Sequence, residues 1–140
     1  MGFWDVERNL GFYAPASSFP NALPNLIFHF KALCVLSALH HICQKSSSKH
    51  RIIIHTNSSN MFDIFNSLRC QPTYNHILKS AVNLLISGAH NHRVLHIPGI
   101  QNCIADTLSR FDFARAESIS HSIKIQSFQP PQVMMGPAKK

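Results

Sequence analysis

The chain has 140 residues, of which 45% are hydrophobic, as is ordinary for one globular domain with a single core. Its formal net charge of +7 suits attraction to a phosphate backbone, although a basic protein without a specific partner has the same balance. No apolar run approaches the roughly 18–20 residues that span a bilayer, and the N-terminus lacks a signal peptide, so we expect a cytoplasmic or nuclear protein with no membrane partner, not a secreted one.

The N-terminal half predicts a hairpin followed by a long helix. Residues 3–14 are typical of two short aromatic strands around an Arg-Asn turn. Prolines and serines between residues 15 and 24 predict an irregular connection. From Leu26 to Gln44 the apolar residues recur at helical spacing, which predicts a well-buried helix. Residues 45–49, with lysines and serines, predict a loop.

The segment Arg51–Asn60 is the centre of the predicted fold. Three consecutive isoleucines stop at a polar cluster, and this pattern predicts a short strand buried on both faces of an α/β sheet. Ligands of open α/β sheets bind beyond the carboxyl ends of the strands. Thr56, Asn57 and Ser58 therefore should lie near a functional site.

Two more helices and a strand follow. Asn60 is expected to cap a short helix whose apolar residues are Phe62, Phe65 and Leu68. A second helix should begin at Pro72 or Thr73 and stop near Gly88. The alternation in His92–Ile97 predicts a second buried strand.

The C-terminal part predicts one last helix and then a tail. Pro98 and Gly99 turn the chain, and Asn102 is expected to cap a helix whose inward residues are Ile104, Ala105, Leu108 and Phe111. The patterning weakens after Phe113, so residues 114–140 are interpreted as a tail or linker with one extra strand at 123–128. Helices alternating with strands indicate the mixed α/β class.

The sequence contains four cysteines, none in a Cys-x-x-Cys pair: Cys34, Cys43, Cys70 and Cys103. Without a signal peptide they are expected to be reduced thiols in the core. His40, His41 and Cys43 are residue types that bind zinc, but neighbours on one helix do not supply four ligands, so we expect no zinc site.

One segment resembles a known family closely. His96–Arg110, His-Ile-Pro-Gly-Ile-Gln-Asn-Cys-Ile-Ala-Asp-Thr-Leu-Ser-Arg, resembles the end of the ribonuclease H domain in retrotransposon polyproteins, which runs His-x-Pro-Gly-x-x-Asn-x-x-Ala-Asp-x-Leu-Ser-Arg. Phe30–Leu39 is similar to the first long helix of that family, which opens with Glu-Ala-Leu, and His55–Asn60 is similar to its Thr-Asp-Asn strand end. The resemblance covers residues 1–113 and points to fungal elements in which reverse transcriptase and ribonuclease H precede a recombinase. It implies a ribonuclease H-like mixed sheet flanked by helices.

The same resemblance implies the loss of the catalytic centre. Enzymes of this family cut the RNA of RNA–DNA hybrids with two magnesium ions held by four carboxylates. Here the first core strand and its Asp have no counterpart, Lys31 stands where the family has Glu, and Asn57 stands where it has the second Asp. Only Asp106 is retained, as a weak metal ligand at best. Unit charges near 4 Å interact by roughly 4 kcal/mol at an effective dielectric of 20, so a lysine there repels the metal. We therefore expect a dead ribonuclease H with no cofactor.

Simpler interpretations of these residues stay open. Asp106 faces solvent or pairs with Lys31, and Asn57 satisfies a strand end through its side chain. The missing first strand would leave two sheet edges without partners. Three alternatives follow: the segment 123–128 fills that gap, the hairpin pairs directly beside Ile52–Ile54, or the protein is only marginally stable.

The leading hypothesis is a catalytically inactive, retroelement-derived ribonuclease H-like domain that binds nucleic acid, an RNA–DNA hybrid or another form, weakly and without sequence preference. The basic residues expected to contact nucleic acid are Lys31, Lys45, Lys49, Arg51, Arg93 and Arg110. A second hypothesis is a residual metal-dependent ribonuclease that uses Asp106. A third is a structural or interaction module, or an unselected pseudogene product. The sequence does not identify a protein partner.

Overall fold

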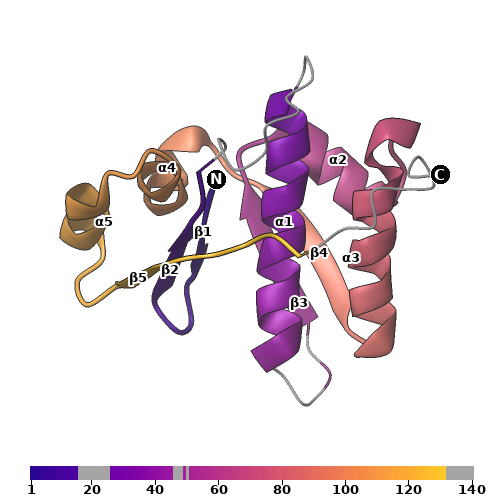
Figure 1. Cartoon of the computed structure of the whole chain (residues 1–140), viewed down its shortest axis with the longest axis horizontal. Coiled ribbons are helices and arrows are strands. Elements are labelled where there is room, and N and C mark those ends of the chain that lie inside the picture. The colour runs from indigo at the N-terminus through magenta and orange to yellow at the C-terminus, as the bar shows by residue number, and fades with distance from the viewer. Residues whose placement is uncertain (16–25, 46–48, 50, 132–140) are drawn as a thin grey trace.

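The computed structural model describes residues 1–15, 26–45, 49 and 51–131, and its elements form a mixed α/β arrangement (Figure 1). The strands are β1 (Gly2–Asp5), β2 (Leu10–Tyr13), β3 (Arg51–Thr56), β4 (Asn91–His96) and β5 (Lys124–Ser127). The helices are α1 (Leu26–Lys45), α2 (Ser59–Ser67), α3 (Asn75–Ser87), α4 (Cys103–Ser109) and α5 (Phe113–Ile119), with 3₁₀ turns at Pro72–Tyr74 and Gly99–Gln101. The predicted hairpin, long helix and two later strands are all present.

The strands form two separate sheets. In one, β2 pairs antiparallel with β1 and parallel with β5, and in the other β3 pairs parallel with β4. The segment 123–128 therefore does not fill a gap between the hairpin and β3, because β5 lies on the far side of β2. The hairpin is not paired with β3 either. Within the described residues, β1 and β3 each keep one edge without a strand partner.

The main core lies on one face of the β3–β4 sheet. Helices α1, α2 and α3 pack there, and the buried residues include Leu36, Leu39, Ile52, Met61, Phe65, Ile77, Ala81 and Val94. The prediction that β3 is buried on both faces is wrong, because Ile53 points away from these helices and is 58% exposed. Alternate residues of a strand face opposite sides, and the described helices that pack on this sheet cover the side of Ile52 and Val94. On the opposite face Ile53 and Arg93 are exposed, and Leu95 is half-buried.

Helix α2 packs against the outer edge of β4. The Asn66 side chain donates to the carbonyl of Val94 and accepts from its N–H, both at 2.9 Å, so the amide takes the place of a neighbouring strand. The N-cap is Ser58, whose hydroxyl accepts from the N–H of Met61 at 3.4 Å, and not Asn60 as predicted. The short side chain of Ser58 begins the helix two residues earlier because it reaches the orphan N–H of the first turn.

A smaller core joins α4 and α5 to the hairpin. Its buried residues are Ile104, Leu108, Ala116 and Ile123. Helix α4 packs closely on β1, since a Cβ added to Gly2 would lie 2.6 Å from the backbone N of Ser109. Phe111 was predicted to face inward, but it follows the helix with a positive φ of 60° and is largely exposed. The packed chain extends past the boundary predicted at residue 113.

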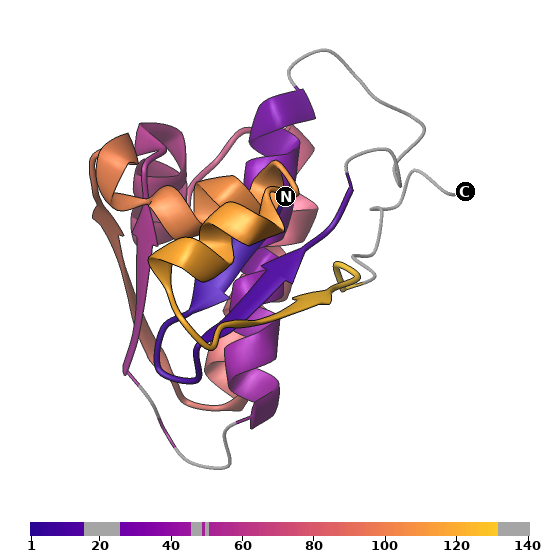
Figure 2. The same cartoon turned by 90° about the vertical axis from the view of Figure 1, so that its left-hand side faces the viewer.

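Helix α1 connects the two sheets. The thiol of Cys34 donates to the carbonyl of Gly2 at 3.2 Å, and burial raises the pKa of this thiol to about 11, so it stays protonated. Near the other end of β1, His41 bonds to Asp5. Figure 2 shows α4 and α5 in front of the hairpin, with α1 behind it. The hairpin is thus held between helices rather than hydrogen-bonded to β3.

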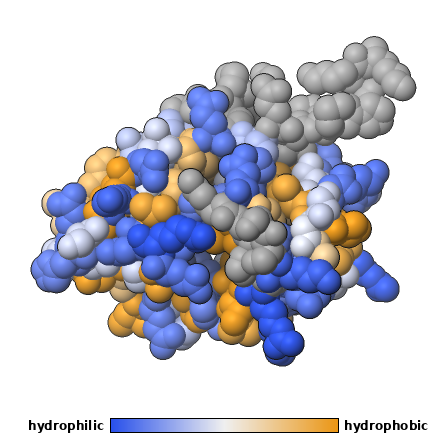
Figure 3. Space-filling model, turned by 90° about the horizontal axis from the view of Figure 1, so that it is seen from below, coloured by the Kyte–Doolittle hydropathy of each residue, from blue (hydrophilic) through white to orange (hydrophobic). Residues whose placement is uncertain are grey.

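The surface has no broad apolar area on the face that Figure 3 shows, where hydrophobic residues are scattered among hydrophilic ones. The large hydrophobic residues that are exposed come from different elements, among them Val6, Ile27, Ile53, Ile86 and Ile100. Single exposed hydrophobic residues are ordinary on protein surfaces. No helix among the described residues is long and apolar enough to cross a membrane. All four cysteines are free and half-buried.

Candidate functional site

The exposed side of the β3–β4 pair carries two arginines. It carries the side chains that alternate with the buried ones, here called the open sheet face: Arg51, Ile53, His55, Asn91, Arg93 and Leu95. Ile53 lies opposite Arg93 in the register, and Arg51 lies opposite Asn91 one pair further along. Among the residues described, no carboxylate lies within ion-pairing distance of either arginine. Both guanidinium groups are exposed and available to an external anion.

The structure brings together only some of the predicted nucleic-acid contacts. Arg51 and Arg93 share the open sheet face, and exposed Lys49 precedes β3 by two residues. Lys31 is half-buried on α1, which covers the opposite face of the same sheet. Arg110 follows α4 beside a pocket, and the side chain of Lys45 lies outside the described residues.

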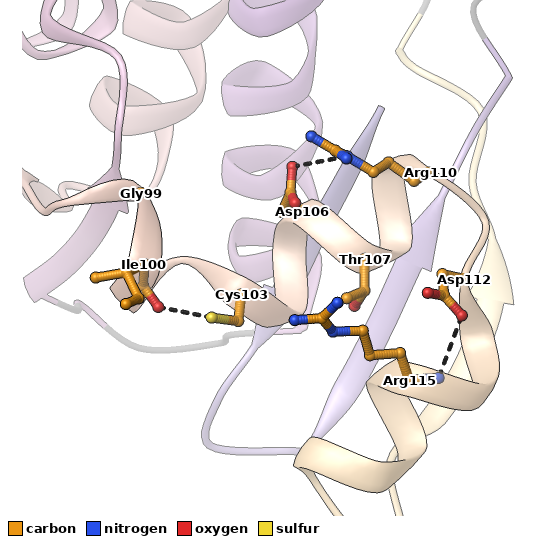
Figure 4. Close-up of a pocket in the computed structure, with 8 residues that line it drawn as sticks. All are labelled: Gly99, Ile100, Cys103, Asp106, Thr107, Arg110, Asp112 and Arg115. Carbon is orange, nitrogen blue, oxygen red and sulfur yellow. Dashed lines mark hydrogen bonds and ion pairs between the residues drawn. The ribbon is translucent and has the colours of Figure 1, made fainter.

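A pocket of about 460 Å³, here called the α4–α5 pocket, lies beyond the carboxyl end of the strand pair. It is lined by Gly99, Ile100, Cys103, Asp106, Thr107, Arg110, Asp112 and Arg115, shown in Figure 4. Asn57 follows β3, and its Nδ2 would lie 3.6 Å from a Cβ placed on Gly99. The predicted site residue Asn57 therefore neighbours this pocket, at the position where open α/β sheets bind ligands.

Asp106, which the sequence resemblance matched to a carboxylate of the ribonuclease H family, is part of an exposed ion pair. Its Oδ1 lies 3.3 Å from Nε of Arg110, and the two side chains are 47% and 75% exposed, respectively. The partner is therefore Arg110 and not Lys31, as one interpretation of the sequence had it. Exposed pairs of this kind contribute about 0–1 kcal/mol, so Arg110 is held only loosely.

The donor set of the pocket does not fit magnesium. Mg²⁺ requires several oxygen ligands in octahedral geometry. The two carboxylates that line the pocket are Asp106, paired with Arg110, and Asp112, which accepts from the backbone N–H of Arg115 at 3.4 Å. Two guanidinium groups line the same pocket and balance both charges. Across the described ranges there is no group of three or more His, Cys, Asp or Glu side chains that could hold a metal ion.

A buried charge cluster ties the hairpin to α1. Asp5 on β1 is 3% exposed in its side chain, and its Oδ2 lies 2.9 Å from Nε2 of His41 and 3.1 Å from the Arg8 guanidinium. Burial acts to raise the pKa of Asp5, but the hydrogen bonds from His41 and Arg8 outweigh it and lower the pKa below its usual value of 3.8. The rings of Phe3 and Phe12 pack on His41. This cluster is structural, because aromatic rings and not an open pocket surround the imidazole.

Sequence reasoning missed two charged residues of the pocket, Asp112 and Arg115. Helix α5 buries a single residue, Ala116, so it has no apolar stripe that a periodicity search would detect. The available signal was Asp112 itself, since an aspartate that caps a helix is a recognisable start.

Comparison with protein-family models, with curated proteins and with solved structures found no match for this chain. The resemblance to ribonuclease H therefore rests on the sequence motifs. The structure itself establishes a mixed α/β arrangement with a small sheet on each side of α1.

Proposed function

We propose that the chain is a catalytically inactive, retroelement-derived ribonuclease H-like domain that binds nucleic acid weakly and without sequence preference. The observation that supports binding is the open sheet face, where Arg51 and Arg93 stand without acidic partners among the described residues. The observation that supports inactivity is the ion pair of Asp106 with Arg110, which occupies the carboxylate that a metal ion would need.

The composition of the open sheet face favours contact with phosphates over contact with bases. The paired N–H groups of an arginine guanidinium match the geometry of phosphate oxygens and bind two of them at once. Sequence-tolerant binding of single strands usually adds stacking on aromatic rings. His55 is the single ring on this face, and its neighbours are the aliphatic Ile53 and Leu95. Backbone contacts fix position but carry no sequence information, so we expect similar affinity for unrelated sequences.

We expect the wild-type chain to leave a labelled RNA–DNA hybrid uncut with either magnesium or manganese. The physical reason is charge: Asp106 supplies one carboxylate, and Arg110 neutralises it. The measurement is denaturing electrophoresis of the hybrid after prolonged incubation, with Asp106→Asn as the control. Metal-dependent cleavage that disappears in Asp106→Asn would show an active nuclease and refute the proposal.

Replacing both Arg51 and Arg93 with glutamine is expected to weaken binding of a single-stranded oligonucleotide about tenfold at low salt. Each lost phosphate contact makes the negative slope of log K against log[salt] shallower by about 0.7 for single strands, so the slope of the double variant should be shallower by about 1.4. Fluorescence anisotropy across a salt series measures both quantities.

The matched control is Arg69→Gln with Lys79→Gln, which removes the same two charges from exposed positions outside the open sheet face. We expect this control to keep most of the affinity. Equal losses in the two double variants would mean that net charge, and not the open sheet face, drives binding. Failure of the wild type to bind any oligonucleotide at low salt would refute the proposed function itself.

A further inference from the structure

The α4–α5 pocket holds two arginines, and among the described residues Arg110 has an acidic ion-pair partner whereas Arg115 has none. We propose that this pocket binds the terminal phosphate of a nucleic-acid strand. Arg115 is the first ligand, and Arg110 is a second ligand that becomes available when its ion pair with Asp106 opens. This inference rests on the proposed function, because it assumes that a strand lies on the open sheet face and ends at the pocket.

Arg115 is placed to contact an anion. Figure 4 shows it reaching from α5 toward α4, with its guanidinium beside Cys103 and Thr107. Asp112 bonds to the backbone N–H of Arg115, not to its side chain. No carboxylate of the described chain lies within ion-pairing distance of the guanidinium. The guanidinium of Arg115 therefore takes part in no ion pair of the described residues, although Asp106 and Asp112 line the same pocket and balance its formal charge.

The charge and position of the pocket favour a strand end over an internal phosphate. The Gly99–Ile100 turn, α4 and α5 line a partly open hollow of about 460 Å³, which has room for a compact group. A terminal phosphate monoester carries about −1.5 to −2 charges near neutral pH, compared with one for an internal phosphodiester. Two guanidinium forks match its oxygens. Asn57, after β3, connects the pocket to the carboxyl end of the open sheet face.

Asp106 restrains the second arginine. Its ion pair with Arg110 is exposed on both sides and is therefore weak. A dianion entering the pocket competes with Asp106 for Arg110 and is at the same time repelled by that carboxylate. Removing the carboxylate should release Arg110 and strengthen phosphate binding. A metal site built on Asp106 makes the opposite prediction, since neutralising the ligand would weaken it.

The test compares three versions of one oligonucleotide: 5′-phosphorylated, 3′-phosphorylated and without a terminal phosphate. At pH 7.5 and low salt, we expect the wild type to bind one phosphorylated version about tenfold more tightly than the unphosphorylated one. This advantage should disappear in Arg115→Gln and increase in Asp106→Asn. Lys79→Gln removes the same charge from α3 and should keep the advantage, and Asp63→Asn, exposed on α2, is the charge-matched control for Asp106→Asn.

The outcomes separate this inference from the proposed function. Equal affinity for all three oligonucleotides, or the same loss in Arg115→Gln and Lys79→Gln, would refute the pocket assignment while leaving binding at the open sheet face intact. Absence of binding to any oligonucleotide would refute the proposed function. If inorganic phosphate alone then stabilised the wild type but not Arg115→Gln, the pocket would be a site for free phosphate, and its assignment to a strand end would be wrong.

Discussion

Replacing Asp5 with alanine is expected to lower the free energy of unfolding by about 3 kcal/mol. The carboxylate is almost fully buried and bonds to His41 on α1 and to Arg8 in the hairpin turn. Because the hairpin has no strand pairing with β3, these bonds are a main polar link between its sheet and α1. Truncation removes the link and leaves the half-buried imidazole without its partner. Urea unfolding followed by circular dichroism at pH 7 measures the loss.

The effect of Asp5→Ala should depend on pH in a defined direction. The folded pKa of Asp5 is lowered, while an unfolded aspartate titrates near pH 3.9. The stabilisation from a lowered pKa is fully present above the unfolded value and is lost as the pH falls through the folded value. The unfolding free energies of wild type and variant should therefore converge below about pH 4. A gap that stays constant into acid would contradict the role of the charged carboxylate.

The matched control is Glu7→Gln. Glu7 is an exposed acid in the same hairpin turn and takes part in none of the ion pairs of the described residues. Its substitution changes the formal charge by the same amount as Asp5→Ala, so we expect a change of only a few tenths of a kcal/mol. If both variants lost the same stability, the effect would come from net charge and not from the buried cluster.

The elements that could be predicted from the sequence are those with a local signal. The isoleucine run predicted β3, the helical spacing predicted α1, and Gly88 marked the end of α3 as expected. The one-sided burial of β3 could not be predicted in the same way, because an apolar run is compatible with either a central or a half-covered strand. Only the placement of the helices on the side of Ile52 decides it.

In the candidate site, too, the contacts between residues far apart in the sequence could not be predicted. The motif around Asp106 predicted its position on the last helix before residue 113. Its ion-pair partner is Arg110, four residues later on the chain, and not the distant Lys31. The hydrogen bond between Asp5 and His41 joins residues that are 36 positions apart, and no local sequence pattern predicts it. Arg115 was missed because its helix has little apolar periodicity. Contacts between distant elements are what the sequence pattern does not specify.

Replacing Phe65 with alanine is expected to lower the free energy of unfolding by about 3–5 kcal/mol, a large part of the roughly 5–15 kcal/mol that stabilises a domain. The ring is 1% exposed and lies in the main core, where its removal leaves a cavity. Helix α2 also holds β4 through its backbone, since His92 bonds to the carbonyl of Phe65. The measurement is the urea midpoint at constant m-value.

Phe62→Ala is the control on the same helix, since this ring is 36% exposed and lies outside the main core. The sequence predicted a short helix that carries both rings, and the structure turns Phe65 into the core and Phe62 outward, so the two variants test this orientation of α2. We expect Phe62→Ala to cost about 1–2 kcal/mol, less than Phe65→Ala, because Phe62 is 36% exposed and its removal leaves no cavity inside the main core. Equal losses at both positions would mean that α2 is rotated from its place in the structure. That rotation would also move Asn66 away from Val94 and leave the edge of β4, and with it the open sheet face, without its support.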